Sequence, residues 1–314
     1  MNLALMFEID AFLVGLLFGS LLNVCIARLP LHQSIVKPRS HCPRCGAMIH
    51  WYDNIPILSF ILLRAKCRKC KAKIPWRYPL VELAVGLWFA LCAFRVFLPL
   101  AVLLHLPVRV YALYGSPWQL LISGVALAIL GFLLIGLLVM DWRTHTLPDA
   151  FTLTGMAIGF ALTCVQALFL APGEGDVHLQ HSMRMSSPGS MAAQGDVFLT
   201  GPEALVLGRI GAIIAAAGIV FLIRWLYKKL RGKEGMGMGD VKLMAMIAAF
   251  LGFWPAMLAL FVGVVLCAVY AVVLLARGRA DGQTRLPLGS FLSIGGLLAA
   301  LFGDRLIDWY RSLL

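Results

Sequence analysis

The chain alternates between long apolar runs and shorter polar segments. The apolar runs cover residues 3–27, 80–98, 118–140, 150–170, 204–226, 241–276 with a break near residues 252–255, and 287–302. Most of them approach the roughly 20 apolar residues that an α-helix needs to cross about 30 Å of hydrocarbon. The pattern therefore predicts an all-α polytopic membrane protein with about eight transmembrane helices, of which the sixth and seventh form a membrane hairpin.

The polar segments divide the chain into three parts. Residues 1–27 are expected to form the first transmembrane span, residues 28–78 a small module outside the membrane, and residues 79–314 the remaining membrane core. Residues 172–202 interrupt that core with a stretch rich in Gly, Ser, Met and Ala that has no periodicity. Such a composition predicts a flexible external loop.

Composition and charge placement agree with a membrane protein. The chain is 61% hydrophobic and only 13% charged, whereas soluble domains average about 25% charged residues. The formal net charge of +12 does not indicate nucleic-acid binding, because the basic residues gather in polar segments between apolar runs. Residues 28–78 hold eleven Lys and Arg against the single acid Asp53. The positive-inside rule then predicts that this module lies in the cytoplasm and the N-terminus outside.

Two Cys-x-x-Cys pairs lie inside the basic module, at Cys42, Cys45, Cys67 and Cys70. Paired turns of this kind, separated here by the 21 residues 46–66, are typical of four-cysteine zinc sites. Four thiolates saturate tetrahedral zinc, so we expect a closed, structural site that lets a small module fold. His41 and His50 are alternative ligands that a complete cysteine set makes unnecessary, and a redox-active cysteine pair is the other alternative.

Asp240 follows three glycines at alternate positions and stands at the start of an apolar run, in the stretch Gly235-Met-Gly237-Met-Gly239-Asp240-Val-Lys242. An ionisable side chain at a membrane edge is costly to retain, which marks it as a functional candidate. Glycines allow close approach of another chain, so an extended substrate fits against the carboxylate. We therefore expect Asp240 to be catalytic, with Gly237, Gly239 and Lys242 in binding or supporting roles. The alternative is an Asp that merely caps the next helix.

Asp141 ends the third apolar run and is expected at the same membrane level as Asp240. Two carboxylates at one face of the bilayer are suited to an aspartyl pair, one acting as base toward water and the other as acid toward the scissile carbonyl. Asp149 is a rival partner, but its Leu-Pro-Asp context suits a helix N-terminus. His145, four residues after Asp141, is a secondary candidate to assist it.

Together these motifs resemble, in identity and order, the type IV prepilin peptidases, which are membrane aspartyl proteases of the Gly-x-Gly-Asp type. The resemblance spans nearly the whole chain. It is carried by residues 16–30 with Gly19, Ser20 and Asn23; the two cysteine pairs around Asn54-Ile55-Pro56; Arg77-Tyr78-Pro79 with Glu82; Asp141 with Leu147-Pro148-Asp149; residues 237–242; and Leu286-Pro287-Leu288-Gly289.

The resemblance implies a bifunctional enzyme of the bacterial inner membrane. Such enzymes remove a basic leader from type IV prepilins or type II secretion pseudopilins after a glycine, on the cytoplasmic side. They then methylate the new N-terminal residue with S-adenosylmethionine. The resemblance assigns catalysis to Asp141 and Asp240. The methyl donor rests on the resemblance alone, because the chain has no glycine-rich Rossmann signature.

Two other classes of function remain open from the residues themselves. A transporter also keeps carboxylates at membrane depth, although we find no second acidic-glycine repeat of the kind that inverted-repeat transporters show. A non-catalytic membrane assembly factor would use the zinc module for docking and would need neither aspartate. The expected partners are prepilins or pseudopilins and membrane lipids, not nucleic acid.

Overall fold

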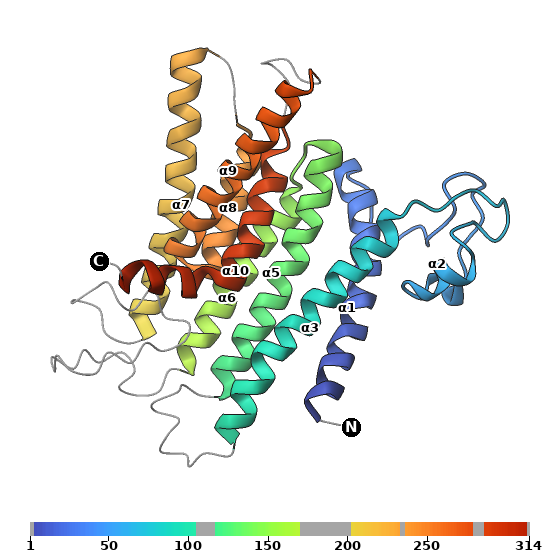
Figure 1. Cartoon of the computed structure of the whole chain (residues 1–314), viewed down its shortest axis with the longest axis horizontal. Coiled ribbons are helices and arrows are strands. Elements are labelled where there is room, and N and C mark those ends of the chain that lie inside the picture. Colours follow the sequence, from blue (N-terminus) through green and yellow to red (C-terminus); the bar gives the residue numbers. More distant parts are fainter. Residues whose placement is uncertain (1–2, 105–116, 170–201, 233–235, 279–285, 313–314) are drawn as a thin grey trace. The chain divides into compact units, whose positions relative to one another are not determined.

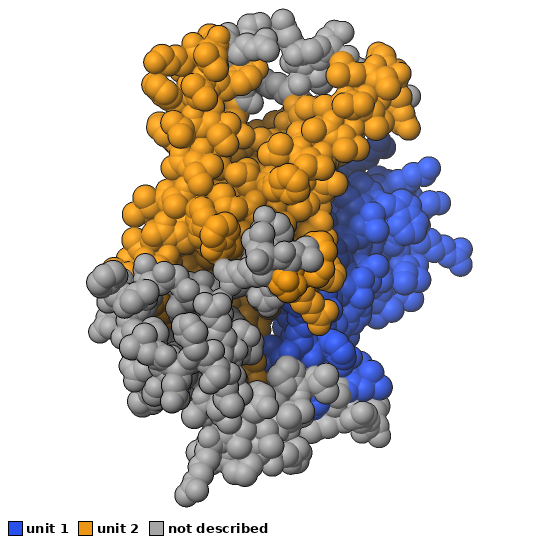
Figure 2. Space-filling model, turned by 60° about the vertical axis from the view of Figure 1, so that its left-hand side comes forward, with its two compact units in different colours: residues 1–98 blue, residues 99–314 orange. Residues whose placement is uncertain are grey.

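The computed structural model describes residues 3–104, 117–169, 202–232, 236–278 and 286–312, in which the regular secondary structure is helical apart from two isolated β-bridges (Figure 1). The predicted external loop at 172–202 lies outside the described residues except for Pro202, and so does Gly235. The chain divides into two compact units, residues 1–98 and 99–314, which Figure 2 shows in separate colours.

The helices follow the apolar runs closely. The first unit contains α1 (Leu3–Arg28), η1 (Leu29–Leu31), η2 (Trp51–Asn54), α2 (Leu58–Leu62) and most of α3 (Arg77–Leu104). The second contains α5 (Pro117–Thr144), α6 (Asp149–Leu168), α7 (Pro202–Arg231), α8 (Met238–Leu251), α9 (Phe253–Ala276) and α10 (Leu288–Ser312). The prediction of an all-helical protein with several membrane spans is confirmed.

Six of the described helices, α1, α3, α5, α6, α7 and α9, are long and apolar enough to cross a membrane. The sixth and eighth predicted spans correspond to shorter helices. With 14 residues, α8 is about 21 Å long, less than the hydrocarbon thickness of about 30 Å. The apolar part of α10 covers Leu288–Gly303. The structure therefore supports six full-length spans where the sequence predicted about eight.

The second unit is built around α8, which contacts α5, α6, α7, α9 and α10. Its side chains at Leu243, Met244, Met246 and Ile247 are completely buried. Small residues on the neighbouring helices make this packing possible, as is common between membrane helices. A Cβ atom on Gly159 of α6, for example, would lie 2.7 Å from the ring of Phe250. The helix that carries Asp240 is thus the central helix of its unit.

A buried arginine on α7 holds the far end of α8. Arg209 is 4% exposed, and its Nη1 lies 3.5 Å from the carbonyl oxygen of Ala248. The last carbonyls of a helix lack intrahelical partners and carry partial negative charge, so a guanidinium is favourable there. Gly252, four residues after Ala248, has a φ of +86° and lets the chain turn directly into α9.

The first unit joins α1 and α3 through close backbone contacts. A Cβ on Gly19 would lie 2.6 Å from the Cα of Glu82, and the side-chain amide of Asn23 donates a 3.0 Å hydrogen bond to the carbonyl of Tyr78. The buried Glu82 carboxylate accepts a 2.8 Å hydrogen bond from the backbone N–H of Ile57. The polar module is thereby tied to the membrane helices of its own unit.

Candidate active site and metal centre

Asp141 lies in the last turn of α5 and is 6% exposed. Its Oδ2 accepts a 2.7 Å hydrogen bond from the backbone N–H of Ser290. The Ser290 hydroxyl, which has one proton to donate, lies 3.1 Å from the same oxygen and 3.0 Å from the carbonyl of Leu138. Ser290 is completely buried in the first turn of α10. Because the start of a helix has free N–H groups and partial positive charge, it is complementary to a carboxylate.

The end of α5 differs slightly from the prediction. The apolar run stops at Met140, but the helix continues to Thr144, so Asp141 is held inside regular structure. His145 then adopts a positive φ of 50°, and its backbone N–H donates to the carbonyl of Asp141 at 2.9 Å. This backbone contact between His145 and Asp141 terminates the helix, and the His145 side chain also lies near enough for a charge interaction with the Asp141 carboxylate.

Asp240 is in the first turn of α8 and is 7% exposed. Its Oδ2 lies 3.2 Å from the backbone nitrogen of Gly237, which donates a hydrogen bond at the helix N-cap. The capping role considered from the sequence is thus present. A carboxylate has about four lone-pair sites, so one such contact leaves acceptor capacity for a water or a substrate.

The second unit brings the two aspartates into one buried site. The charge on Asp141 acts on Asp240, and the charges of both act on the Cys267 thiol of α9. Asp141 comes from the end of α5 and Asp240 from the start of α8, although 99 positions separate them in the chain. Two carboxylates in a buried site cannot both hold a full negative charge cheaply, which favours one shared proton.

Two glycines admit the side chain of Leu147, from the α5–α6 connection, into this site. A Cβ on Gly239 would lie 3.0 Å from the Leu147 Cβ, and a Cβ on Gly289 would lie 2.9 Å from its Cδ1. The Gly289 Cβ would also lie 3.1 Å from the Asp141 carboxyl carbon. Both positions therefore require the smallest residue for close packing around the carboxylates.

Lys242 and Asp149, which were also singled out from the sequence, form an ion pair at the surface. The ammonium group of Lys242 lies 2.6 Å from Oδ1 of Asp149, with 31% and 61% of the two side chains exposed. Asp149 is the first residue of α6, as its Leu-Pro-Asp context predicted. This pair joins the starts of α6 and α8. Its two residues are close to the aspartates in sequence, but they are partly exposed, whereas Asp141 and Asp240 are buried.

Three aromatic rings pack together beside the buried acids. Trp142 contacts Tyr270 and Phe291 at ring-centroid distances of 5.5 and 6.1 Å, and Tyr270 lies 5.3 Å from Phe291. Sequence reasoning did not identify these rings, Cys267 or Ser290. The signal that could have indicated Ser290 is its position directly after Leu286-Pro287-Leu288-Gly289 at the start of a helix.

The four cysteines of the first unit form a compact cluster. One sulfur atom from each of Cys42, Cys45, Cys67 and Cys70 lies within 4.8 Å of the others. The sulfurs of Cys42 and Cys70 are 3.8 Å apart. A tetrahedral zinc with bonds of about 2.3 Å separates its sulfurs by about 3.8 Å, so the donor set and its spacing fit a tetrahedral metal ion.

Two equivalent turns build this cluster. The backbone N–H of Cys42 donates a 2.9 Å hydrogen bond to the carbonyl of Ala47, and the backbone N–H of Cys67 donates a 2.8 Å hydrogen bond to the carbonyl of Ala72. Gly46 and Lys71 occupy the same place in the two turns, with φ of +67° and +58°. Each turn is closed by an isolated β-bridge, His41 to Met48 and Lys66 to Lys73. The second turn thus repeats the first at an offset of 25 residues.

The electrostatics of the cluster suit metal binding. Hydrogen bonds from the backbone N–H groups of Cys45 and Arg44 lower the pKa of Cys42 to about 6, which favours the thiolate that metals bind. For Cys70, a hydrogen bond from the Ala72 backbone lowers the pKa, but desolvation and three neighbouring sulfurs outweigh it and raise the pKa to about 11. A cation is needed for all four sulfurs to be thiolates at neutral pH.

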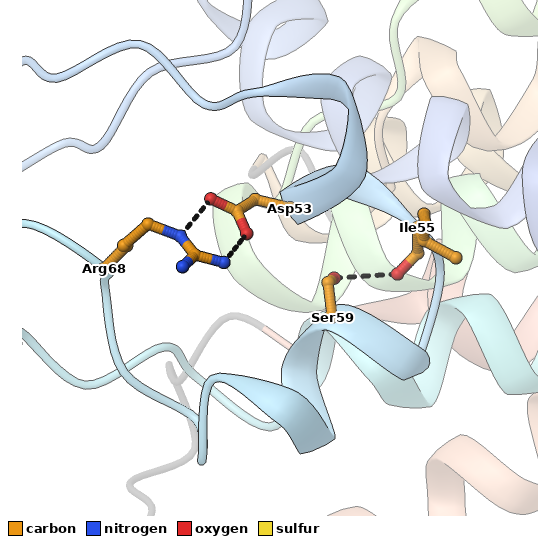
Figure 3. A network of polar contacts seen from close by, with 4 residues as sticks. All are labelled: Asp53, Ile55, Ser59 and Arg68. Atoms are coloured by element: carbon orange, nitrogen blue, oxygen red, sulfur yellow. Dashed lines mark hydrogen bonds and ion pairs between the residues drawn. The ribbon is translucent and has the colours of Figure 1, made fainter.

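The rest of the polar module is held by other contacts. Figure 3 shows that both carboxylate oxygens of Asp53 accept hydrogen bonds from Arg68, at 2.6 and 2.8 Å, and that the Ser59 hydroxyl donates to the carbonyl of Ile55. Within the described residues the histidines considered as ligands lie outside the sulfur cluster. The ring nitrogen of His41 is 3.1 Å from the Arg39 carbonyl, and the ring of His50 stacks on Tyr52.

Comparison with known families matches both units. The profile of the Bacterial Peptidase A24 N-terminal domain matches residues 13–96, and that of the Type IV leader peptidase family matches residues 194–272. No solved structure matches.

Comparison with characterised proteins extends the match over nearly the whole chain. The chain is 30% identical to a "Prepilin leader peptidase/N-methyltransferase" of Stutzerimonas stutzeri, over 98% of this chain and 94% of that protein. It is 34% identical to the protein of that name from Myxococcus xanthus, over 89% of this chain and 67% of the relative. A third such protein, from Pseudomonas aeruginosa, is 29% identical over 98% of this chain and 94% of its own length.

Proposed function

The chain belongs to the prepilin leader peptidase/N-methyltransferase family, and on that premise we propose that Asp141 and Asp240 are the residues that carry out its peptidase reaction. The family activity, removal of prepilin leader peptides and N-methylation, is the function of this multi-pass membrane enzyme. The observation that supports the two residues is their joint burial, since two neighbouring acids of unlike surroundings are the arrangement that acid–base hydrolysis requires.

In the proposed reaction, the pair hydrolyses the peptide bond without a covalent intermediate. Asp141 holds the negative charge, because its Oδ2 accepts a 2.7 Å hydrogen bond from the backbone N–H of Ser290 and lies within reach of the Ser290 hydroxyl. Asp240 holds the shared proton, because it is buried beside that charge. Asp141 then takes a proton from water as the water attacks the scissile carbonyl, while Asp240 donates its proton to the developing oxyanion.

The substrate would approach the carboxylates along the start of α8. An extended peptide needs a backbone that offers no bulky side chain. Gly237 and Gly239 precede Asp240 there; Gly237 leaves room beside the Asp240 carboxylate, whereas Gly239 packs against Leu147. We infer that cleavage follows a glycine at the end of a basic leader, in type IV prepilins or type II secretion pseudopilins. From the basic module and the positive-inside rule we infer that the site faces the cytoplasmic side of a bacterial inner membrane and that the N-terminus lies outside, with α8 and the start of α10 embedded as the sixth and eighth helices of the predicted order.

The four-cysteine cluster is proposed to hold a structural Zn²⁺. When bound, zinc links the two turns and compensates the charge of four thiolates. Because four sulfur ligands leave no position for water, the ion has no part in the hydrolysis. S-adenosylmethionine is proposed as the methyl donor on the strength of the relatives' names.

The decisive experiment uses the purified full-length protein and a prepilin in detergent or nanodiscs. The substrate is incubated with and without S-adenosylmethionine, and the mass of the product is measured. We expect loss of the leader in both reactions and addition of one methyl group only with the methyl donor. A prepilin that stays intact in both, under conditions where a relative's enzyme cleaves it, would contradict the proposal.

A further inference from the structure

A groove of 520 Å³ follows one face of α1 at its C-terminal end, entirely within the first unit. Leu17, Leu21, Val24 and Arg28 line it from the helix. Their spacings of four, three and four residues place them on one helical face. The eleven residue steps from Leu17 to Arg28 rise about 16 Å along the helix axis. This side of the groove is therefore apolar over most of its length and ends at the guanidinium group of Arg28.

The opposite wall comes from the polar module and mixes apolar side chains, among them Val36 and Trp51, with the polar side chains of Arg39, Ser40 and Asn54. The Val36 and Trp51 side chains are 74% and 75% exposed. Adjacent exposed apolar side chains of this size mark an interaction surface. Since α1 is a candidate membrane span over Leu5–Leu31, the groove lies at the end of that span, where tryptophan is common at the membrane–water interface.

The rim of the groove carries positive charge that the described residues do not neutralise. Arg28 and Arg39 line it, and within the described parts of the chain neither is paired with a carboxylate. Arg28 instead donates to the carbonyls of Ser34 and Pro38, at 3.0 and 2.7 Å, which fixes the loop beside the groove. Asp53, the single acid of residues 28–78, has both oxygens engaged by Arg68 (Figure 3).

From this arrangement we propose that the groove is a binding site for one anionic phospholipid. An acyl chain lies along Leu17, Leu21 and Val24, and the phosphate lies between Arg28 and Arg39. The ligand chemistry follows from an apolar stripe inside the membrane. This stripe ends, at headgroup level, in two guanidinium groups that have no carboxylate partner among the described residues. S-adenosylmethionine suits this lining poorly, because its sulfonium and amino groups are cationic and the lining contains no carboxylate.

This site differs from general attraction between a basic module and an anionic membrane surface, and the test must separate the two. The full-length protein is reconstituted in phosphatidylcholine nanodiscs with increasing phosphatidylglycerol, and the lipid retained after transfer to detergent is counted by native mass spectrometry. Arg39→Gln removes one groove charge, and Leu21→Trp fills the apolar stripe. Lys73→Gln removes one charge from an exposed residue of the same module that does not line the groove.

We expect one retained phosphatidylglycerol per wild-type protein and about fivefold weaker retention for Arg39→Gln, equivalent to about 1 kcal/mol for one basic residue near the headgroups. Leu21→Trp should also lose the lipid, while Lys73→Gln should keep it. Zinc content and the thermal unfolding midpoint confirm that each variant is folded. Equal losses in Arg39→Gln and Lys73→Gln would overturn the proposal, and so would displacement of the lipid by S-adenosylmethionine with the same dependence on Arg39.

Discussion

Ser290 donates its backbone N–H to Oδ2 of Asp141 at 2.7 Å, and its hydroxyl lies between that oxygen, at 3.1 Å, and the carbonyl of Leu138, at 3.0 Å. This contact joins the start of α10 to the end of α5, across 149 positions of the chain. It fixes the orientation of the carboxylate and leaves Oδ1 as the oxygen available to water. We therefore regard Ser290 as a positioning residue for the proposed base.

Replacement of Ser290 by Ala removes the hydroxyl donor and keeps the backbone donor. Hydrogen bonds to charged groups contribute about 1.5–3 kcal/mol, so we expect kcat/KM for leader cleavage to fall by about tenfold or more. Ser293→Ala is the matched control, because that buried hydroxyl donates within its own helix to the carbonyl of Gly289. Equal cleavage rates for the two variants would remove Ser290 from the site.

Asp141→Asn and Asp240→Asn should each abolish leader cleavage. Asn keeps the shape of the side chain but cannot exchange a proton as a carboxylate does, so the pair loses its acid–base chemistry. Product mass after incubation with prepilin reports cleavage, and zinc content reports the fold of the cysteine module. Asp149→Asn serves as the control at the neighbouring, exposed acid, and near-normal processing by either buried-site variant would exclude that residue as catalytic.

Glycines beside the carboxylates should resist replacement. An Ala at Gly289 places its Cβ 3.1 Å from the Asp141 carboxyl carbon, and a Val at Gly239 crowds Leu147. We expect both changes to lower the cleavage rate more than they lower the unfolding midpoint. The control is Gly211→Ala on α7, where a Cβ meets nothing within 4 Å, and a normal rate for Gly239→Val would reduce the glycine run to a linker.

Lys242→Met tests whether this residue supports substrate binding or only the surface pair with Asp149. Exposed ion pairs contribute about 0–1 kcal/mol, and 31% of the Lys242 side chain and 61% of the Asp149 side chain are exposed. We therefore expect a change in kcat/KM of less than about fivefold. A rise in KM with unchanged kcat, which Asp149→Asn does not reproduce, would instead indicate direct contact between Lys242 and the substrate.

Local signals in the sequence predicted the helices and the cysteine cluster well. Apolar runs located most of the described long helices within about six residues, but α10 continues ten residues beyond its predicted end at residue 302. The Leu-Pro-Asp context located the start of α6 at Asp149. The two Cys-x-x-Cys turns predicted their cluster because each turn is formed by neighbouring residues. The break of α8 near Gly252 was predicted as well, whereas the end of α10 was not, because that helix continues to Ser312 beyond its apolar part.

Most contacts between segments that are distant in the chain could not be predicted from the sequence. The pairing of Asp141 with Asp240 was predicted from a shared membrane level, but Ser290 was not, because no pattern around Asp141 specifies which helix start will face it. The same holds for Cys267 and for the packing of Leu147 against Gly239 and Gly289. Such contacts depend on how several helices pack together, which periodicity along one segment does not determine.

The four-cysteine module, with its proposed zinc ion, and the peptidase should be separable. Four thiolates would leave a zinc ion no open position. We expect Cys42→Ser with Cys45→Ser to unfold residues 28–78 and to eliminate N-methylation if that module carries the methyl-donor site, while leader cleavage falls less because Asp141 and Asp240 lie on other helices. Bound zinc, cleavage and methylation are measured on one preparation, with Cys164→Ser on α6 as a control for cysteine loss. Full methylation with complete loss of cleavage would contradict the prediction, and a zinc-free wild-type protein with both activities would show that the cysteines have another role.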